Sequence, residues 1–157
     1  MLAKVPRYSL GEWWLIADSL VLMPLLALAL KLTSFRRVQA ALRYTSPMLV
    51  PELSPARTAQ AKQLTLLRAR RVAGIVNAVA ARGPYRANCL KRSLALWWLL
   101  RQRGIDTTLR IGVRKGENNF EAHAWIEYDS VVINDRPAFV RQFIPFAGDI
   151  IGAYKFI

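Results

Sequence analysis

The stretch that decides the fold is residues 107–135, TTLRIGVRKGENNFEAHAWIEYDSVVIND. Apolar and polar residues alternate through it, which predicts three strands, at Thr107–Arg114, Phe120–Tyr128 and Val131–Asp135. A loop at 115–119 separates the first two strands, and a tight turn near Asp129 and Ser130 separates the last two. Short strands joined in this way predict a small antiparallel sheet.

Apolar residues at helical spacing precede these strands. They predict helices within residues 13–32, 35–44, 56–81 and 89–103, and Gly104 stops the last of them. Helices followed by strands indicate an α+β fold, with helices packed on the sheet. Prolines at 47, 51 and 55 mark an extended connection. We therefore expect an N-terminal helical extension at residues 1–55 and a main domain at residues 56–157.

The composition fits one compact unit that works in a reducing compartment. The chain has 157 residues and is 54% hydrophobic, which is enough to bury a core. Its single cysteine excludes an intrachain disulfide, so we expect a cytoplasmic protein.

The net charge of +13 is unevenly distributed. Residues 19–105 carry 15 basic side chains and one acidic side chain, whereas residues 106–157 carry six basic and seven acidic ones. A cationic region of this kind favours an acidic peptide, a phospholipid surface or nucleic acid as partner. Because the chain has no nucleic-acid motif and its aromatic residues are not interleaved with its arginines, we expect no nucleic-acid partner.

The most apolar stretch is WWLIADSLVLMPLLALALKL, residues 13–32. Asp18 lies within it, Pro24 interrupts it, and its uncharged run from Ser19 to Leu30 has 12 residues. A bilayer requires about 20 apolar residues, so we expect a core or interface helix. Two alternatives stay open, namely contact with a membrane surface, which would make the protein peripheral to the membrane, and a signal-type segment.

Cys89 is a candidate nucleophile. Asn88 is a good helix N-cap, so Cys89 would begin the helix at 89–103. Free backbone N–H groups and the helix dipole at that position favour the thiolate, the form of cysteine that attacks carbonyls. The alternative is a buried cysteine that acts as a small apolar side chain.

The single histidine, His123, would supply the base. On its strand it shares a face with Glu121, Trp125 and Glu127. A thiolate that attacks and an imidazole that protonates the leaving amine together perform thiol catalysis. The alternative is a structural histidine hydrogen-bonded near the sheet surface.

Asp135 would orient the histidine if the register of the last two strands allows it. A two-residue turn would pair Tyr128 with Val131 and place His123 opposite Arg136. A three-residue loop would instead pair His123 with Asp135, and we expect that register. The alternative is that Asp135 only terminates a strand.

The order of these motifs resembles a known family. RANCLKRSLALWWLLRQRGIDTTLRIGV, FEAHAWIEY and VVIND place Cys, His and Asp at spacings of 34 and 12. This order is similar to the transglutaminase-like superfamily, whose core is papain-like, and resembles more closely the leader peptidases, or B-type maturation proteins, of lasso peptide biosynthesis. The resemblance covers about residues 60 to 140.

The resemblance implies a cysteine protease that removes the leader from a ribosomally made lasso peptide precursor, with Cys89, His123 and Asp135 as catalytic residues. It implies the precursor leader, a separate leader-recognition protein and a lasso cyclase as partners. No cofactor is needed, and one Cys with one His is too few for a protein zinc site. Three further residues are candidates for substrate binding, namely Arg92, Glu121 and Trp125. The alternative is a solvated helix face for Arg92 and packing for Trp125.

Two other functions stay open from the sequence. The same acyl-enzyme could be resolved by an amine, which would make the protein an amide-exchange enzyme. A non-enzymatic cationic protein that binds a membrane or a partner would explain the charge, but not the order of Cys, His and Asp.

Overall fold

The computed structural model describes residues 9–45, 59–85, 87–116 and 119–146. Four long or medium helices precede the sheet, α1 (Leu10–Leu32), α2 (Phe35–Tyr44), α3 (Ala59–Arg82) and α4 (Cys89–Arg101). The strands are β1 (Thr108–Lys115), β2 (Phe120–Tyr128), β3 (Val131–Val132) and β4 (Ile144–Pro145), with a short helix α5 (Pro137–Val140) between the last two. The predicted α+β class is confirmed.

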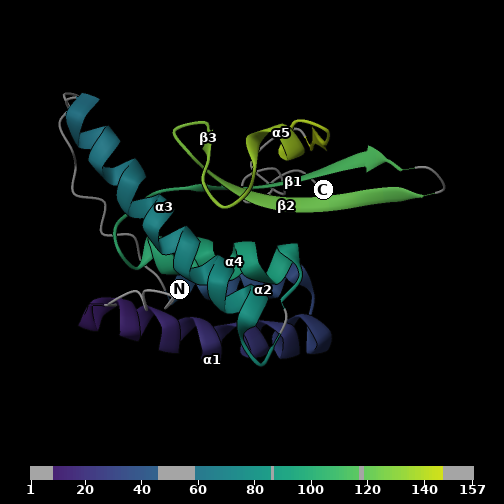
Figure 1. Cartoon of the computed structure of the whole chain (residues 1–157). Helices are drawn as coiled ribbons and strands as arrows, with labels where there is room; N and C mark the ends of the chain where they lie inside the picture. Colours follow the sequence, from purple (N-terminus) through teal and green to yellow (C-terminus); the bar gives the residue numbers. More distant parts are fainter. Residues whose placement is uncertain (1–8, 46–58, 86, 117–118, 147–157) are drawn as a thin grey trace, which may run out of the picture.

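The helices and the sheet form layers around α4. In Figure 1, α1 lies at the base and the sheet at the top, with α4 between them and α5 above the sheet. α4 contacts β2 on one side and α1 and α3 on the other. Leu94, Leu96 and Leu100 of α4 are fully buried, as are Leu109 of β1 and Ile126 of β2. The central helix is thus surrounded by core, which fixes its first turn against the sheet.

The sheet is antiparallel, in the order β3-β2-β1-β4. β1 and β2 pair along their whole length, with Gly112 opposite His123. Both faces of β2 are covered, because Ala124 and Ile126 pack on the helices whereas Trp125 packs with Val140 and Phe143. The alternation of residues along β2 predicted that Ala124 and Ile126 share a packing face, but no pattern in the sequence predicted α5 or β4.

The expected register of β2 and β3 is wrong. Tyr128 pairs with Val131 across a two-residue turn. Asp129 and Ser130 both have positive φ, of 48° and 64°, as a tight hairpin turn with the twist of the strands requires. The third strand also ends at Val132 instead of Asp135. The pairing assumed in the prediction, with His123 directly opposite Asp135 in the ladder, therefore does not occur.

Helix ends agree with the sequence pattern where the structure describes them. Gly104 has a φ of 69° and ends the turn after α4, with the Ile105 N–H donating to the Leu100 carbonyl at 3.0 Å. At the other end of the molecule, the backbone N–H of Ser9 donates to Glu12 Oε2 at 2.8 Å, which caps α1.

The N-terminal helices share one core with α4. Leu15, Met23 and Leu26 of α1 lie in one buried cluster with the leucines of α4. α1 is also long and apolar enough to span a membrane by length and composition, a test that core helices and signal sequences pass as well. The expected domain boundary at residues 55 and 56 lies outside the described residues and stays a prediction.

Candidate active site

Cys89 is the first residue of α4, as predicted. The side chain of Asn88 caps the helix by accepting a hydrogen bond from the Lys91 backbone N–H at 3.1 Å. The Cys89 thiol is free and half-buried. It therefore lies at the positive end of the helix dipole, where a thiolate is favoured over a thiol.

His123 lies in the middle of β2, and its ring is packed under the segment that follows β3. The Phe139 and Phe143 ring centroids are 5.1 and 5.2 Å from the imidazole centroid, and Trp125 is 6.3 Å away in a stacked orientation. Only 11% of the histidine side chain is exposed. These aromatic neighbours fix the plane of the ring and exclude water from most of it.

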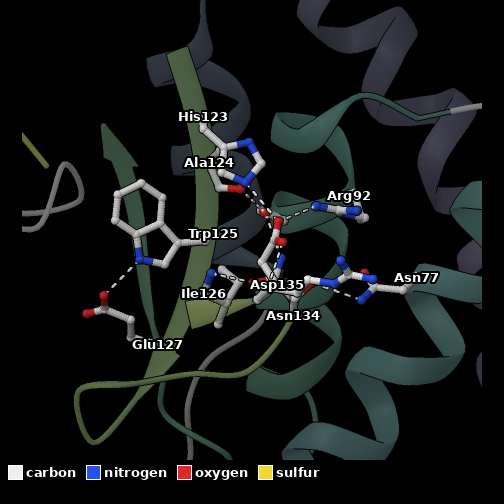
Figure 2. A network of polar contacts seen from close by, with 11 residues as sticks. Asn77, Arg92, His123, Ala124, Trp125, Ile126, Glu127, Asn134 and Asp135 are labelled. Atoms are coloured by element: carbon white, nitrogen blue, oxygen red, sulfur yellow. Dashed lines mark hydrogen bonds and ion pairs between the residues drawn. The ribbon is translucent and has the colours of Figure 1, made fainter. Parts of the chain in front are cut away.

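Asp135 contacts His123 despite the difference in register. His123 Nε2 lies 2.8 Å from Asp135 Oδ2, a hydrogen bond that leaves Nδ1 as the other ring nitrogen (Figure 2). Arg92 Nη2 donates to the same carboxylate oxygen at 3.1 Å. Asp135 Oδ1 accepts the Arg136 backbone N–H at 2.8 Å. The carboxylate is thus held from three sides in the orientation that reaches the imidazole.

A buried polar network brings Asp135 to this position (Figure 2). The Asn134 side chain takes the place of a backbone carbonyl of a paired strand, because its Oδ1 accepts a hydrogen bond from the Ile126 N–H at 2.8 Å. Its Nδ2 donates to Ser93 Oγ at 3.0 Å, and Ser93 Oγ in turn donates to the Ala124 carbonyl at 3.0 Å. Asn77 Nδ2 of α3 donates to the Asn134 carbonyl at 2.9 Å. The chain leaves the ladder after Val132, and these contacts direct it toward His123.

The same contacts place the first turn of α4 against β2. Arg92 and Ser93 lie about one helical turn after Cys89, and they bond to Asp135 and to the carbonyl next to His123 respectively. Within the described part of the chain, no hydrogen bond joins the Cys89 sulfur to the His123 ring. The structure therefore brings His123 and Asp135 together directly, with Cys89 at the start of the adjacent helix.

The three predicted substrate-binding residues lie in different environments. Arg92 is bound to Asp135. Trp125 is 2% exposed and donates from its Nε1 to Glu127 Oε1 at 2.8 Å. Glu121 is half-exposed, forms an ion pair with Arg114 at 2.6 Å, and borders an open hollow of about 730 Å³ near the end of the β1–β2 hairpin. Their roles in substrate binding stay predictions.

Sequence reasoning missed several residues that shape the site. Asn134 and Ser93 lie within quoted motifs, but their burial could not be read from one sequence. Phe139 and Phe143 follow the last predicted strand, and Arg114 lies over both rings at 5.3 and 4.8 Å from their centroids. The spacing of these two phenylalanines was the available signal, because four positions apart they share one face of a helical turn.

The described residues contain no group of three His, Cys, Asp or Glu side chains that could hold a metal ion.

Comparisons with known proteins identify the family of the chain. The sequence profile described as the transglutaminase-like superfamily matches residues 27–147, which include α4, β1, β2 and all three candidate catalytic residues. The chain is also 43% identical over 53 residues to the microcin J25-processing protein McjB of Escherichia coli, and the match covers 34% of this chain and 24% of that protein. No solved structure matches significantly. Because the profile covers most of the chain, and because the order of elements fits it, the chain belongs to the transglutaminase-like superfamily.

Proposed function

We propose that this chain is a cysteine peptidase that removes the leader peptide from a lasso peptide precursor. The observation that carries the proposal is the 2.8 Å contact between His123 Nε2 and Asp135 Oδ2, next to a helix that begins with the single cysteine. The similarity to a microcin J25-processing protein supports the substrate class. The activity would follow from three side chains held by α4, β2 and the segment after β3.

The proposed mechanism divides amide hydrolysis into two steps. The Cys89 thiolate attacks the scissile carbonyl to form a carbon–sulfur bond, and His123 gives its proton to the leaving amine as the carbon–nitrogen bond breaks. Water then attacks the thioester with His123 as base, which releases the leader carboxylate and restores the thiol. Asp135 holds the imidazole so that Nδ1 is the nitrogen available to the sulfur, because Nε2 is bound to the carboxylate.

The surroundings of Cys89 supply part of the charge stabilisation. As the first residue of α4, Cys89 has a backbone N–H that is not bonded within the helix. This N–H is the group we assign to one half of an oxyanion hole for the tetrahedral intermediate. Arg92 acts on Asp135 in this scheme, since its guanidinium and the imidazole share one carboxylate oxygen.

The test is cleavage of a precursor encoded near this gene, followed by mass spectrometry. We expect Cys89→Ala and His123→Ala to abolish cleavage, and Asp135→Asn to slow it by orders of magnitude through loss of the correct ring orientation. Asp129→Asn is the matched control, because Asp129 is an exposed aspartate on the β2–β3 turn and bonds only Lys62 among the described residues. Cleavage by pure Cys89→Ala protein at the wild-type rate would exclude the peptidase.

The same spectra distinguish hydrolysis from amide exchange. A leader that ends in a carboxylate shows that water resolved the acyl-enzyme, whereas a leader that carries an added amine shows exchange. If neither product forms with any precursor and the variants behave alike, the chain is a binding protein instead.

Leader recognition would belong to a separate polypeptide. The described residues before α3 form two helices and no strands, so they do not offer a sheet edge to which a leader could add. A recognition protein that binds both leader and peptidase makes cleavage nearly intramolecular. We therefore expect slow cleavage by this chain alone, a strong increase when the recognition protein is added, and a smaller increase at high salt. The lasso cyclase would act on the freed amine of the core peptide.

A further inference from the structure

The outward side of α1 carries an apolar stripe that the exposed Asp18 interrupts once. Its members are between 53% and 83% exposed, and they are Leu10, Trp14, Val21, Leu25, Leu28 and Leu32. They recur every three or four residues except between Trp14 and Val21, which are about two helical turns apart. We call these six residues the α1 stripe. Positions at this spacing lie on one face of a helix, so the stripe runs the length of α1.

The opposite face of α1 is already used by the protein core. Leu15, Ser19, Met23 and Leu26 are at most 3% exposed and pack toward α3 and α4. A helix of a water-soluble domain normally turns polar residues outward, whereas α1 is apolar on both sides. An exposed apolar patch of this kind marks an interaction surface.

The charged residues beside the α1 stripe differ between its two halves. The first half of α1 contains Glu12, which is paired with Arg71, and the exposed Asp18. Residues 19–45 contain Lys31, Arg36, Arg37 and Arg43 and no acidic residue. All four basic side chains are exposed, and α2, which carries the three arginines, packs against α1. Asp18 is exposed between Trp14 and Val21 and borders a pocket together with Arg103. The second half of the stripe, together with α2, therefore complements an extended anionic partner with an apolar interior.

We propose that α1 lies flat on an anionic lipid bilayer, with the α1 stripe at the level of the headgroups and upper acyl chains. The basic residues of the α1 end and of α2 would contact the lipid phosphates. Trp13 and Trp14, both exposed near the start of α1, are the side chains that favour the membrane interface.

The packing of α1 favours this flat orientation over a membrane-spanning one. A spanning helix is surrounded by lipid or by other spanning helices, which would require Leu15, Met23 and Leu26 to leave the core. In Figure 1, α1 forms the layer farthest from the sheet. A bilayer bound to α1 would thus leave β2 and the start of α4 accessible to a peptide from the aqueous side.

The experiment is co-sedimentation of the full chain with extruded vesicles. One set contains phosphatidylcholine with about 30% phosphatidylglycerol, and the other contains phosphatidylcholine alone. We expect binding at least about tenfold tighter to the anionic vesicles, and a weakening of that binding as salt screens the basic side chains.

Two leucine variants separate the stripe from general charge effects. Leu25→Glu and Leu64→Glu both place a carboxylate at an exposed helical position, since these leucines are 55% and 52% exposed, but only Leu25 is in the α1 stripe. Leu25→Glu should lower the affinity about tenfold or more, because the leucine no longer inserts, and Leu64→Glu should change it less than about threefold. Val21→Ser is a second stripe variant, and circular dichroism verifies that each variant is folded.

Each other outcome overturns the proposal. Equal losses in Leu25→Glu and Leu64→Glu, or no sedimentation with either vesicle, would mean that α1 does not enter the bilayer. A dimer in light scattering that Leu25→Glu disrupts would assign the stripe to a second copy of the chain. Resistance to extraction at alkaline pH would assign it to a spanning helix. Because binding is measured without a precursor, the proposal and the peptidase function fail or stand separately.

Discussion

Replacement of Asn134 by alanine tests how Asp135 is held beside His123. The Asn134 side chain is 3% exposed and makes two hydrogen bonds, to the Ile126 N–H at 2.8 Å and to Ser93 Oγ at 3.0 Å. Alanine removes both and leaves the Ile126 N–H buried without a partner. An orphaned buried N–H costs about 1 to 3 kcal/mol, and the second hydrogen bond contributes about 1 kcal/mol. We therefore expect Asn134→Ala to lower the free energy of unfolding by about 2 to 4 kcal/mol.

Urea unfolding followed by circular dichroism measures this change, and Asn77→Ala is a second variant in the same network, for comparison. Asn77 donates one hydrogen bond to the Asn134 carbonyl, while its own Oδ1 is buried and has no partner among the described residues. Loss of the bond is partly offset by removal of that unsatisfied oxygen, so we expect a cost below about 1 kcal/mol. If Asn134→Ala costs less than about 1 kcal/mol, the Asn134 side chain does not hold the Asp135 segment, and the reasoning from Figure 2 is refuted.

Three further predictions concern stability. Gly112→Ala should destabilise the protein by about 1 to 3 kcal/mol in calorimetry, because a Cβ there would lie 2.9 Å from both the Ile144 carbonyl and the Trp125 ring. Gly74→Ala should instead stabilise α3 by about 0.5 to 1 kcal/mol, because a Cβ there would have nothing within 4 Å. A larger loss of stability in Gly74→Ala than in Gly112→Ala would be inconsistent with the packing. Ser130→Gly should raise the unfolding free energy by about 0.5 to 1 kcal/mol, since φ is 64° there, and an unchanged urea midpoint would argue against a strained turn. The hydrogen bond from Arg71 lowers the Glu12 pKa from 4.5 to about 2. The stabilisation by ionised Glu12 is therefore present above pH 4.5 and is lost as the pH falls toward 2. The difference in melting temperature between wild type and Glu12→Gln should shrink over that pH range.

The sequence predicted the elements whose pattern is local. β2 and α2 have the predicted bounds, and α4 begins at Cys89 because Asn88 is a cap and ends near the glycine stop. Alternation and helical spacing repeat within a few residues, so they can be recognised without knowledge of the partner surface.

The route of the chain after Ser130 could not be predicted in this way. The choice between two turn lengths depends on whether Asp129 and Ser130 accept positive φ, and neither residue type decides this on its own. Asp135 reaches His123 because the Ile126 N–H donates to the Asn134 side chain instead of to the backbone of a paired strand. The pair was thus predicted correctly for a wrong geometric reason.

The path of residues 131–146 also determines when the site is completed during folding. This segment pairs with the β2 edge as β3, crosses the His123 face as α5, and pairs with the β1 edge as β4. The β1–β2 and β2–β3 hairpins are local contacts, whereas pairing of β4 with Gly112 closes a longer loop, so we expect the β4 pairing to form later. We therefore expect the imidazole to gain its aromatic cover from Phe139 and Phe143 after both hairpins have formed, so a partly folded chain would expose the histidine ring that the folded chain covers.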